Sequence, residues 1–550
     1  MKALDALRLQ LAWDRLLAIV EEQAQTLMRT AFSTVVREAG DLSAGVFDTE
    51  GSMLAQAITG TPGHVNAMAR SVSHFLKRYP LPNMNEGDVF LTNDPWLATG
   101  HLNDFTVVTP VYYRERPVAL FASTSHIADV GGRGFGPDAN DVFEEGINIP
   151  IMALFNAGVR NETLMEIIAA NVRDPVVAEG DLYSLTACNE TGGRDLQSMM
   201  TAHELESLDE IASYVLATSR VAMEHEINAL PTGIYENSMD VDGYDVPVHI
   251  ECAMHVDKDR ILIDFSGSSP TSRYGINVPV NYTEAYASFG VRCLVGNSIP
   301  NNAGSLGTIR VAAPEGSILN AMPPCAVSAR HALGQMLPDV IMGCLEQIMP
   351  ESVAAEGASC IWNPVLMNAR QTGEDVADTP FVINPIYNGG TGARFMKDGL
   401  STTAFPSGVR TTPTEINEVT SPLIFERREF CQDSGGRGRH RGGLGQIVEI
   451  RHGRDNSFFV SKMFDRIEHP ARGRAGGGNG RPGKVYIKNG TPLRGKGKDL
   501  VPAGATLVLE TPGGGGFGNP SERNENDIRR DVEDGFVSGS SRNKADVVSP

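Results

Sequence analysis

Two short stretches of the chain repeat the pattern His-x-x-Asp. "GHLNDF" contains His101 and Asp104, and "SHIADV" contains His126 and Asp129. Imidazole and carboxylate groups together form a ligand set that suits Zn, Mn or Fe, and a site with few protein ligands leaves positions for water or a substrate. The alternative is a pair of ordinary histidines at strand ends, each hydrogen-bonded to its aspartate. A single copy favours that alternative, so the question is whether the two copies converge.

The segments that carry these residues predict a β-hairpin. "DFTVVTPVYY" and "PVALFASTSH" are rich in β-branched and aromatic residues and are separated by a polar turn. With the turn centred on Arg114–Glu115, facing residues have numbers that sum to about 229, which sets Asp104 opposite Ser125 and Asn103 opposite His126. Cross-strand neighbours have Cβ atoms about 4.5–5.5 Å apart. The hairpin therefore predicts that both histidines and Asp104 meet at one edge of a sheet, although the two interpretations above remain open.

The remaining elements predict an α+β protein. We expect an amphipathic helix in the first thirty residues, a hairpin at 42–57, a helix at 66–79, helices over 161–230 and strands from 234 to about 314. Helices follow at 326–348, and strands with abundant glycine from about 414. Strands and helices in runs, without a βαβ rhythm, indicate mixed or antiparallel sheets flanked by helices. Because 550 residues exceed one ordinary core, we expect three domains, at 1–233, 234–413 and 414–550.

Composition excludes several classes of function. No run of about 18 uncharged apolar residues is present, so we expect no membrane span. The net charge of −20 disfavours binding to nucleic acid, and the basic "RGKGK" at 494–498 is short and lacks aromatic residues. The 7 cysteines include no C-x-x-C pair, which suits reduced thiols in the cytoplasm better than a disulfide framework.

Glycine-rich motifs invite a nucleotide or anion site. "GNGRPGKV" at Gly478–Val485 nearly matches a P-loop, yet Val485 stands where a hydroxyl should hold magnesium, and a strand-like segment follows instead of a helix. We therefore predict no nucleotide site there. "TPGGGGFGNP" at 511–520 is more typical of tight turns. "SGGRGRHRGG" at 434–443 either cradles a carboxylate or phosphate or pairs with acidic surface on a partner.

Several motifs, in order along the chain, resemble the hydantoinase B family. They are "AFSTVVREAGDLSAGVFDTEGSMLAQA", "TNDPWLATGHLNDFTVVTPV", "SHIADVGG", "EEGINIP", "DSGGRGRHRGGLG" and "TPGGGGFGNPSERNENDIRRDVEDGFVS". The family comprises B-type subunits of ATP-dependent hydantoinases, the corresponding half of 5-oxoprolinase, lactam hydrolase subunits and the α-type subunits of acetone and acetophenone carboxylases. The resemblance runs from about residue 10 to 545.

The resemblance implies a metal site and a partner subunit. Carried over residue by residue, the metal ligands are Asp41 in "REAGDLS", His101, Asp104 and His126. Nothing local marks Asp41 as a ligand. The metal is expected to be one divalent transition ion, Zn first, with Mn or Fe as alternatives. The expected partner is an A-type subunit, in a heterodimer or an (AB)2 assembly, that binds ATP and Mg and phosphorylates the carbonyl oxygen of the substrate.

These features predict a subunit of an ATP-dependent hydrolase of cyclic amides such as hydantoins, lactams or oxoproline. Asp129 is a candidate proton acceptor, and His64, Arg330 and His331 are candidates to hold substrate or phosphate, with structural hydrogen bonding as an equal alternative. Two other functions stay open: a subunit of an ATP-dependent ketone carboxylase, and a non-catalytic partner subunit.

The chain also departs from many relatives. Ser125 precedes His126 where they have a second histidine, and Arg133 lies in "GGRGFGPD" where they have "GGxxPG". We expect Arg133 to influence the charge preference for the substrate.

Overall fold

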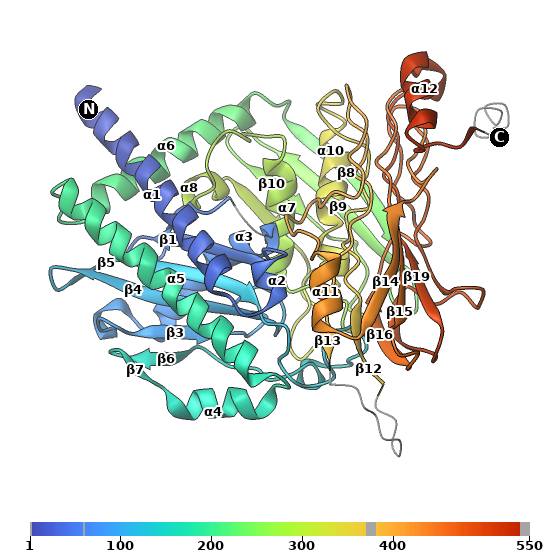
Figure 1. Cartoon of the computed structure of the whole chain (residues 1–550). Coiled ribbons are helices and arrows are strands. Elements are labelled where there is room, and N and C mark those ends of the chain that lie inside the picture. Colours follow the sequence, from blue (N-terminus) through green and yellow to red (C-terminus); the bar gives the residue numbers. More distant parts are fainter. Residues whose placement is uncertain (1–2, 59–60, 370–380, 540–550) are drawn as a thin grey trace. The chain divides into compact units, whose positions relative to one another are not determined.

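A computed structural model of the chain describes residues 3–58, 61–369 and 381–539 (Figure 1). The chain divides into two compact units. The first unit comprises residues 1–238, 250–344 and 407–410, and the second comprises residues 239–249, 345–406 and 411–550. Whether the boundaries predicted at 233/234 and 413/414 separate independently folding domains stays a prediction. Among the described residues, no helix combines the length and the apolar character needed to cross a membrane.

The first unit is built on an antiparallel sheet of seven strands, in the order β2-β1-β5-β4-β3-β6-β7. The central strands β4 and β5 bury nearly every side chain, as expected of a sheet that is covered on both faces. The strands are β1 (Leu42–Phe47), β2 (Met53–Gln56), β3 (Val89–Thr92), β4 (Asp104–Tyr113), β5 (Arg116–His126), β6 (Met152–Asn156) and β7 (Val159–Arg160).

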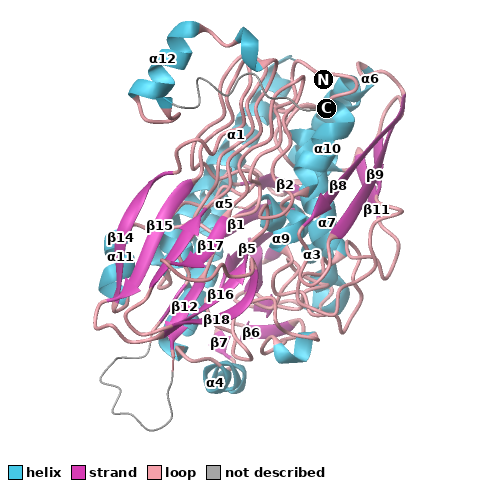
Figure 2. Ribbon diagram, turned by 90° about the vertical axis from the view of Figure 1, so that its right-hand side faces the viewer, coloured by secondary structure: helices cyan, strands magenta, loops and turns pink. Residues whose placement is uncertain are grey.

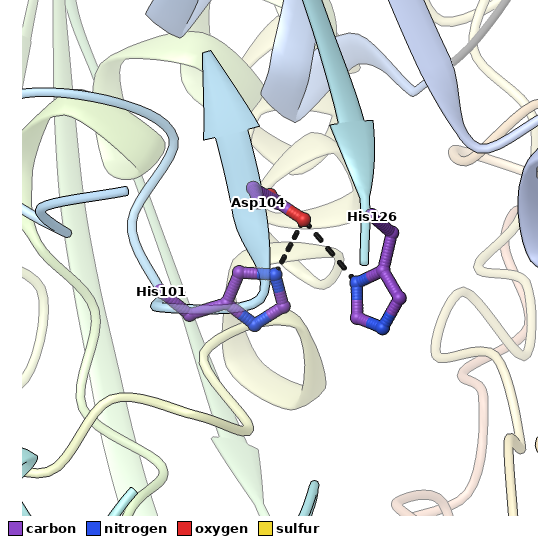
Figure 3. A group of neighbouring side chains, drawn as sticks. All are labelled: His101, Asp104 and His126. Atoms are coloured by element: carbon purple, nitrogen blue, oxygen red, sulfur yellow. Dashed lines mark hydrogen bonds and ion pairs between the residues drawn. The ribbon is translucent and has the colours of Figure 1, made fainter. Parts of the chain in front are cut away.

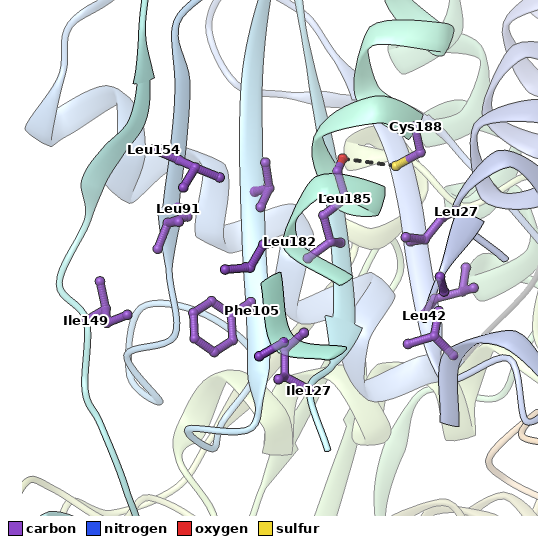
Figure 4. Packing of buried hydrophobic residues seen from close by; sticks show 14 of the residues in the cluster. Leu27, Leu42, Leu91, Phe105, Ile127, Ile149, Leu154, Leu182, Leu185 and Cys188 are labelled. Atoms are coloured by element: carbon purple, nitrogen blue, oxygen red, sulfur yellow. Dashed lines mark hydrogen bonds between the residues drawn. The ribbon is translucent and has the colours of Figure 1, made fainter. Parts of the chain in front are cut away.

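Two long helices pack on one face of this sheet and a third packs on the other. The first face carries α1 (Ala3–Thr30) and α5 (Pro175–Ala202), and the second carries α3 (Pro62–Arg78). Figure 4 shows Leu27 of α1 and Leu182 and Leu185 of α5 in the core beside the strands. The predicted helices at the N-terminus and near 66–79 are thus confirmed.

The rest of the first unit surrounds a smaller mixed sheet, in which β10 and β11 pair in parallel. Its strands are β8 (Gly233–Val241), β9 (Val248–Val256), β10 (Ile261–Asp264) and β11 (Ile309–Ala312), and residues 239–249 of the first two belong to the second unit. The α-helices are α2 (Thr34–Arg37), α4 (Glu162–Asn171), α6 (Asp209–Asn228), α7 (Val280–Arg292), α8 (Ala303–Leu306), α9 (His331–Gly334) and α10 (Leu337–Leu345); the short 3-10 helices are η1 (Leu81–Asn83) and η2 (Val142–Glu144).

The second unit contains two four-stranded sheets. One follows the order β13-β12-β16-β18 and the other β14-β15-β19-β17. The elements are β12 (Val365–Asn368), β13 (Val382–Ile383), α11 (Thr414–Thr420), β14 (Leu423–Phe430), β15 (Gln446–His452), β16 (Phe458–Met463), β17 (Lys484–Ile487), β18 (Lys496–Val501), β19 (Thr506–Glu510), η3 (Pro520–Glu522) and α12 (Glu525–Glu533).

Extended loops run side by side between these strands and α12 (Figure 2). Four of their segments, residues 389–392, 435–443, 473–480 and 513–518, form what we call the glycine layer. Their backbones hydrogen-bond directly to one another, for example Gly514 N to Gly443 O at 3.0 Å and Gly443 N to Thr391 O at 2.9 Å. The segments predicted as tight turns or as an anion cradle are therefore joined to each other by main-chain contacts.

The predicted fold class, α+β with mixed and antiparallel sheets flanked by helices, is confirmed. The predicted hairpin forms, and its turn centres on Arg114 and Glu115, which both have positive φ as a tight two-residue turn requires. The predicted register at the far end was wrong. A β-bulge between Val111 and Tyr112 shifts the pairing by one residue, so that Asp104 faces His126.

Candidate metal centre

Three buried side chains converge where β4 begins and β5 ends (Figure 3). His101 lies on the loop before β4, Asp104 is the first residue of β4, and His126 is the last residue of β5. One potential ligand atom from each lies within 4.8 Å of the other two. Oδ1 of Asp104 is 2.6 Å from Nε2 of His101 and 3.2 Å from Nδ1 of His126. We call these three residues the His-Asp-His cluster.

The tautomer of His101 follows from its second nitrogen. Nδ1 lies 3.0 Å from the carbonyl oxygen of Ser328, which can only accept, so Nδ1 carries the proton and donates it. Burial, together with the Arg330 guanidinium, lowers the pKa of His101 to about 4, so the ring is neutral at pH 7. Its Nε2 therefore presents a lone pair toward a carboxylate oxygen, without a hydrogen bond to any described residue. A cation bound beside both atoms would relieve the repulsion between these two lone pairs.

Asp104 is held by its other oxygen. Oδ2 accepts from Thr99 Oγ1 at 2.8 Å, and it lies 2.9 Å from Nε2 of His64 and 2.5 Å from the guanidinium of Arg330. Burial works against the ionised carboxyl, but His101, His64 and Arg330 outweigh it and hold the pKa of Asp104 well below its usual range. Oδ1 is thereby left facing the two imidazoles as a fixed negative charge.

His126 completes the cluster through strand pairing. Its backbone N–H donates to the carbonyl of Asp41 at 3.3 Å, and cross-strand pairing sets it against Asp104. The ring nitrogen Nε2 is buried and has no hydrogen-bond partner among the described residues. A buried imidazole nitrogen without a partner is costly unless something outside the protein binds it.

Asp41 and His64 lie beside the cluster. Oδ1 of Asp41 accepts from Thr61 Oγ1 at 2.6 Å and is 3.5 Å from Nδ1 of His64, so the predicted ligand Asp41 contacts His64 and is not one of the three grouped donors. His64 is thus placed between Asp41 and Asp104. Burial opposes the charged form of this ring, but the two aspartates outweigh it and raise its pKa.

Arg330 and His331, predicted to hold substrate, are both buried in the walls of this site. The Arg330 side chain donates from Nε to the carbonyl of Thr99 at 2.7 Å and lies over the ring of Tyr282 at 4.0 Å. The ring of His331 stacks on Phe135 with centroids 5.7 Å apart. These contacts tie Arg330 to Asp104 and His331 to Phe135; their roles toward a substrate stay predictions.

Asp129, the predicted proton acceptor, is engaged elsewhere. Oδ1 accepts from the Gly131 amide at 3.1 Å, and the carboxylate forms an ion pair with the guanidinium of Arg173. The backbone N–H of Arg173 also donates to Oδ2. Both oxygens are therefore occupied, and the second His-x-x-Asp motif contributes its histidine but not its aspartate to the cluster.

Sequence reasoning missed the residues that enclose the cluster. The ring of Phe135 meets those of His101 and His126 edge-on, at centroid distances of 5.6 and 5.0 Å. The buried carboxyl of Glu145 accepts from the backbone of residues 327–328. Neither residue has a characteristic spacing from the histidines, so no local pattern could have identified them.

The His-Asp-His cluster fits a divalent metal ion. Its donors are two imidazoles and one ionised carboxylate, all buried, and two ring nitrogens lack hydrogen-bond partners among the described residues. This donor set suits Zn, Mn or Fe. Neighbouring groups also hold these donors in place: the Ser328 carbonyl orients His101, and Arg330 anchors Asp104.

The glycine-rich motifs offer no comparable site. Gly483 is followed by strand β17, so the helix that a P-loop requires is replaced by a strand. In the arginine-rich segment, Arg441 lies 3.3 Å from Asp531 and Arg439 lies 3.7 Å from Glu522, so the carboxylates that these side chains bind come from their own unit.

Comparison with known proteins identifies the family to which the chain belongs. The family model described as hydantoinase B/oxoprolinase matches residues 5–520. The chain is 29% identical to 5-oxoprolinase 1 of Arabidopsis thaliana over 94% of its own length but only 42% of that protein, so it spans less than half of this relative. It is 26% identical to the B-type subunit of a putative D-/L-hydantoinase from Pseudomonas sp. (strain NS671), over 98% of this chain and 94% of that one.

Two solved structures share the fold. The ATP-dependent caprolactamase from Pseudomonas jessenii superposes with a TM-score of 0.88 at 22% identity, covering 98% of this chain and 95% of that chain. Acetone carboxylase in its nucleotide-free structure gives a TM-score of 0.84 at 18% identity, covering 97% and 78%. The extent of the family match decides the assignment: the chain belongs to the hydantoinase B/oxoprolinase family.

Proposed function

We propose that this chain is the metal-bearing B-type subunit of an ATP-dependent enzyme that hydrolyses a cyclic amide of the hydantoin, lactam or oxoproline type. The observation that carries the proposal is the His-Asp-His cluster, in which a neutral imidazole lone pair faces a carboxylate at 2.6 Å. The relatives named as a hydantoinase subunit and a 5-oxoprolinase support the choice of substrate class.

The chemistry explains why ATP and a second subunit are needed. An amide carbonyl is a poor electrophile, whereas an O-phosphorylated amide is a much better one. We assign ATP, Mg and the phosphorylation step to an A-type partner, in a heterodimer or an (AB)2 assembly. The present chain would then receive the activated substrate.

His101, Asp104 and His126 would hold one divalent ion, with Zn as first choice and Mn or Fe as alternatives. Such an ion supplies Lewis-acid chemistry, lowering the pKa of water and polarising a carbonyl. The protein's own contribution is to fix the donors. Ser328 keeps the His101 proton on Nδ1, and Arg330 with Thr99 keeps Asp104 ionised and oriented. Phe135 covers the rings of both histidines and excludes water from that side.

The proposal also assigns roles to Asp129 and His331, which are not among the three metal ligands. The Asp129 carboxylate is paired with Arg173, so accepting a proton from the reacting water would weaken that ion pair. His331, stacked on Phe135, is a second candidate, to contact a substrate that approaches the cluster. Both assignments remain part of the proposal and are tested by single substitutions.

The decisive experiment measures metal content and activity together. The chain is co-expressed with its A-type partner, metal is quantified by mass spectrometry, and ATP-dependent ring opening of hydantoins and lactams is followed without bicarbonate. His101→Ala and His126→Ala are expected to lose the metal and to lower activity by more than the roughly 10–100-fold that loss of a residue supporting a ligand causes. His249→Ala, in an exposed His–Asp pair, is the matched control and should change neither.

Protein without stoichiometric metal, with activity unchanged in both variants, would instead support a non-catalytic role for this chain. A second candidate reaction is ATP-dependent carboxylation of a ketone, which the fold of acetone carboxylase favours. If ketones consume bicarbonate with this protein and its partner while cyclic amides are not opened, the hydrolase proposal is wrong and the carboxylase assignment replaces it.

A further inference from the structure

Glu145 is a buried carboxyl that the proposed reaction does not use. It follows η2 and is only 4% exposed. Its Oε1 accepts two hydrogen bonds, from the backbone N–H groups of Val327 and Ser328, each at 2.7 Å. Its Oε2 is buried and has no hydrogen-bond partner among the described residues. A half-satisfied buried carboxyl costs stability, so its presence calls for an explanation.

The backbone that Glu145 holds also supports the cluster. The carbonyl of Ser328 accepts the Nδ1 proton of His101 at 3.0 Å. Two residues later, the Arg330 guanidinium contacts Oδ2 of Asp104. One short segment, residues 327–330, therefore orients two of the three members of the His-Asp-His cluster, and its amide side is fixed by Glu145.

The position of Glu145 is itself tightly determined. A Cβ at Gly275 would come within 3.0 Å of Oε1, so glycine there lets the carboxyl reach the two amides. Gly146, next in the chain, has a φ of +149°, and a Cβ there would lie 2.4 Å from the carbonyl of Val130. Burial raises the pKa of Glu145 to about 8, which agrees with a carboxyl kept away from water.

We propose that Glu145 is a positioning residue for the metal centre. By fixing the amides of residues 327–328, it places the Ser328 carbonyl that holds the His101 proton on Nδ1, and so leaves the Nε2 lone pair free for a metal ion. This inference rests on the proposed function, because it concerns the same cluster. It differs from a simple structural role, in which Glu145 would only stabilise the fold.

The test measures metal affinity on the full-length chain, freed of metal and titrated with Zn²⁺ by calorimetry. Glu145→Ala removes both hydrogen bonds and is expected to weaken Zn²⁺ binding about 10–100-fold, as loss of residues that support metal ligands usually does. Glu145→Gln retains an oxygen acceptor at the Oε1 position and should restore affinity to within a few-fold of the original. Glu144→Ala is the matched control, because this neighbouring carboxylate pairs with Arg133 at the surface.

A spectroscopic readout separates positioning from folding. Co²⁺ bound in place of Zn²⁺ absorbs visible light with a spectrum set by its ligands, and we expect Glu145→Ala to change that spectrum while Glu144→Ala does not. If Glu145→Ala fails to fold, Glu145→Asp retains the carboxyl group but shortens the side chain by one methylene, withdrawing that group from the amides. It should weaken Zn²⁺ binding in the same way.

The outcomes are distinguishable. Unchanged Zn²⁺ affinity and Co²⁺ spectrum in folded Glu145→Ala or Glu145→Asp would overturn the inference and leave the proposed metal centre intact. Equal losses in Glu145→Gln and Glu145→Ala would also overturn it, because the acceptor at Oε1 would not be the operative group. If the unsubstituted chain binds no stoichiometric metal, the proposed function fails first and this inference falls with it.

Discussion

The His-Asp-His cluster and the glycine layer are both rich in motifs typical of ligand sites, but they are built in opposite ways. In the cluster, side chains from a loop and two strands meet, and backbone groups orient them. In the glycine layer, backbone meets backbone, and many of its glycines have no room for a side chain: a Cβ at Gly442 would lie 1.9 Å from the carbonyl oxygen of Gly514. A motif therefore indicates a site only where its neighbours leave space for side chains to converge.

The cluster should be the more sensitive of the two to loss of one side chain. Asp104→Ala leaves Arg330 buried without its carboxylate, and breaking a buried ion pair in this way costs about 3–5 kcal/mol. We expect urea unfolding of the metal-free chain to show this loss, together with loss of Zn²⁺ binding. Asp240→Ala removes the carboxylate of an exposed His–Asp pair and should cost less than about 1 kcal/mol. Similar losses in the two variants would show that the cluster is not an electrostatically coupled unit.

The glycine layer should be sensitive to addition of one methyl group. Gly442→Ala forces a Cβ against the carbonyl of Gly514, and overpacking of this kind costs about 1–3 kcal/mol, with larger values where backbone must move. We expect a lower midpoint of thermal unfolding and unchanged Zn²⁺ affinity of the folded protein. Gly539→Ala is the control, because a Cβ there meets nothing within 4 Å. A drop in Zn²⁺ affinity for Gly442→Ala would contradict the separation of roles.

The sequence was informative where side-chain periodicity and turn chemistry determine structure. The hairpin of β4 and β5 and the convergence of His101, Asp104 and His126 followed from alternation and from a two-residue turn. The register near His126 could not be predicted in this way. It depends on a β-bulge, which packing across the sheet determines and which has no fixed sequence signature.

The remaining features could not be predicted, because they depend on contacts between residues far apart in the sequence. Glu145 acts on a segment 182 residues away, and no periodicity links such positions. Asp41 came only from the family resemblance, and it lies next to His64 and outside the three grouped donors. The contacts within the glycine layer could not be predicted either, because glycine has no side-chain pattern from which its partners could be inferred.

Stability should depend on pH in opposite directions at two buried glutamates. Burial raises the pKa of Glu145 from 4.5 to about 8, so the folded state holds its proton longer than the unfolded state, and this stability is lost as pH rises from about 4.5 to 8. At Glu356, burial is outweighed by Arg466 and Arg472, which lower the pKa, so its contribution is present above pH 4.5 and lost as pH falls below it.

Each glutamate changes the slope of the unfolding free energy against pH by at most about 1.4 kcal/mol per pH unit. Unfolding free energies measured between pH 4 and 9 should therefore decline less on the alkaline side in Glu145→Gln than in the unsubstituted chain. Glu356→Gln lacks the ion pairs with Arg466 and Arg472, so it should be less stable near neutral pH and should decline less on the acid side. Parallel pH profiles for Glu145→Gln and the unsubstituted chain would show that the Glu145 carboxyl titrates normally.

The smallest effect is expected at Arg133, which lies on the loop that carries Phe135 and forms an exposed ion pair with Glu144. Such pairs contribute about 0.2–1 kcal/mol, so Arg133→Ala should barely change the unfolding midpoint. Its effect belongs to substrate choice: removing one exposed positive charge should raise KM by a few-fold for a cyclic amide that carries a carboxylate and leave KM for a neutral lactam unchanged. Equal changes for both substrates would mean that Arg133 acts by holding the loop. In that case even this exposed residue would serve the cluster by positioning, as the buried ones do, rather than through its charge.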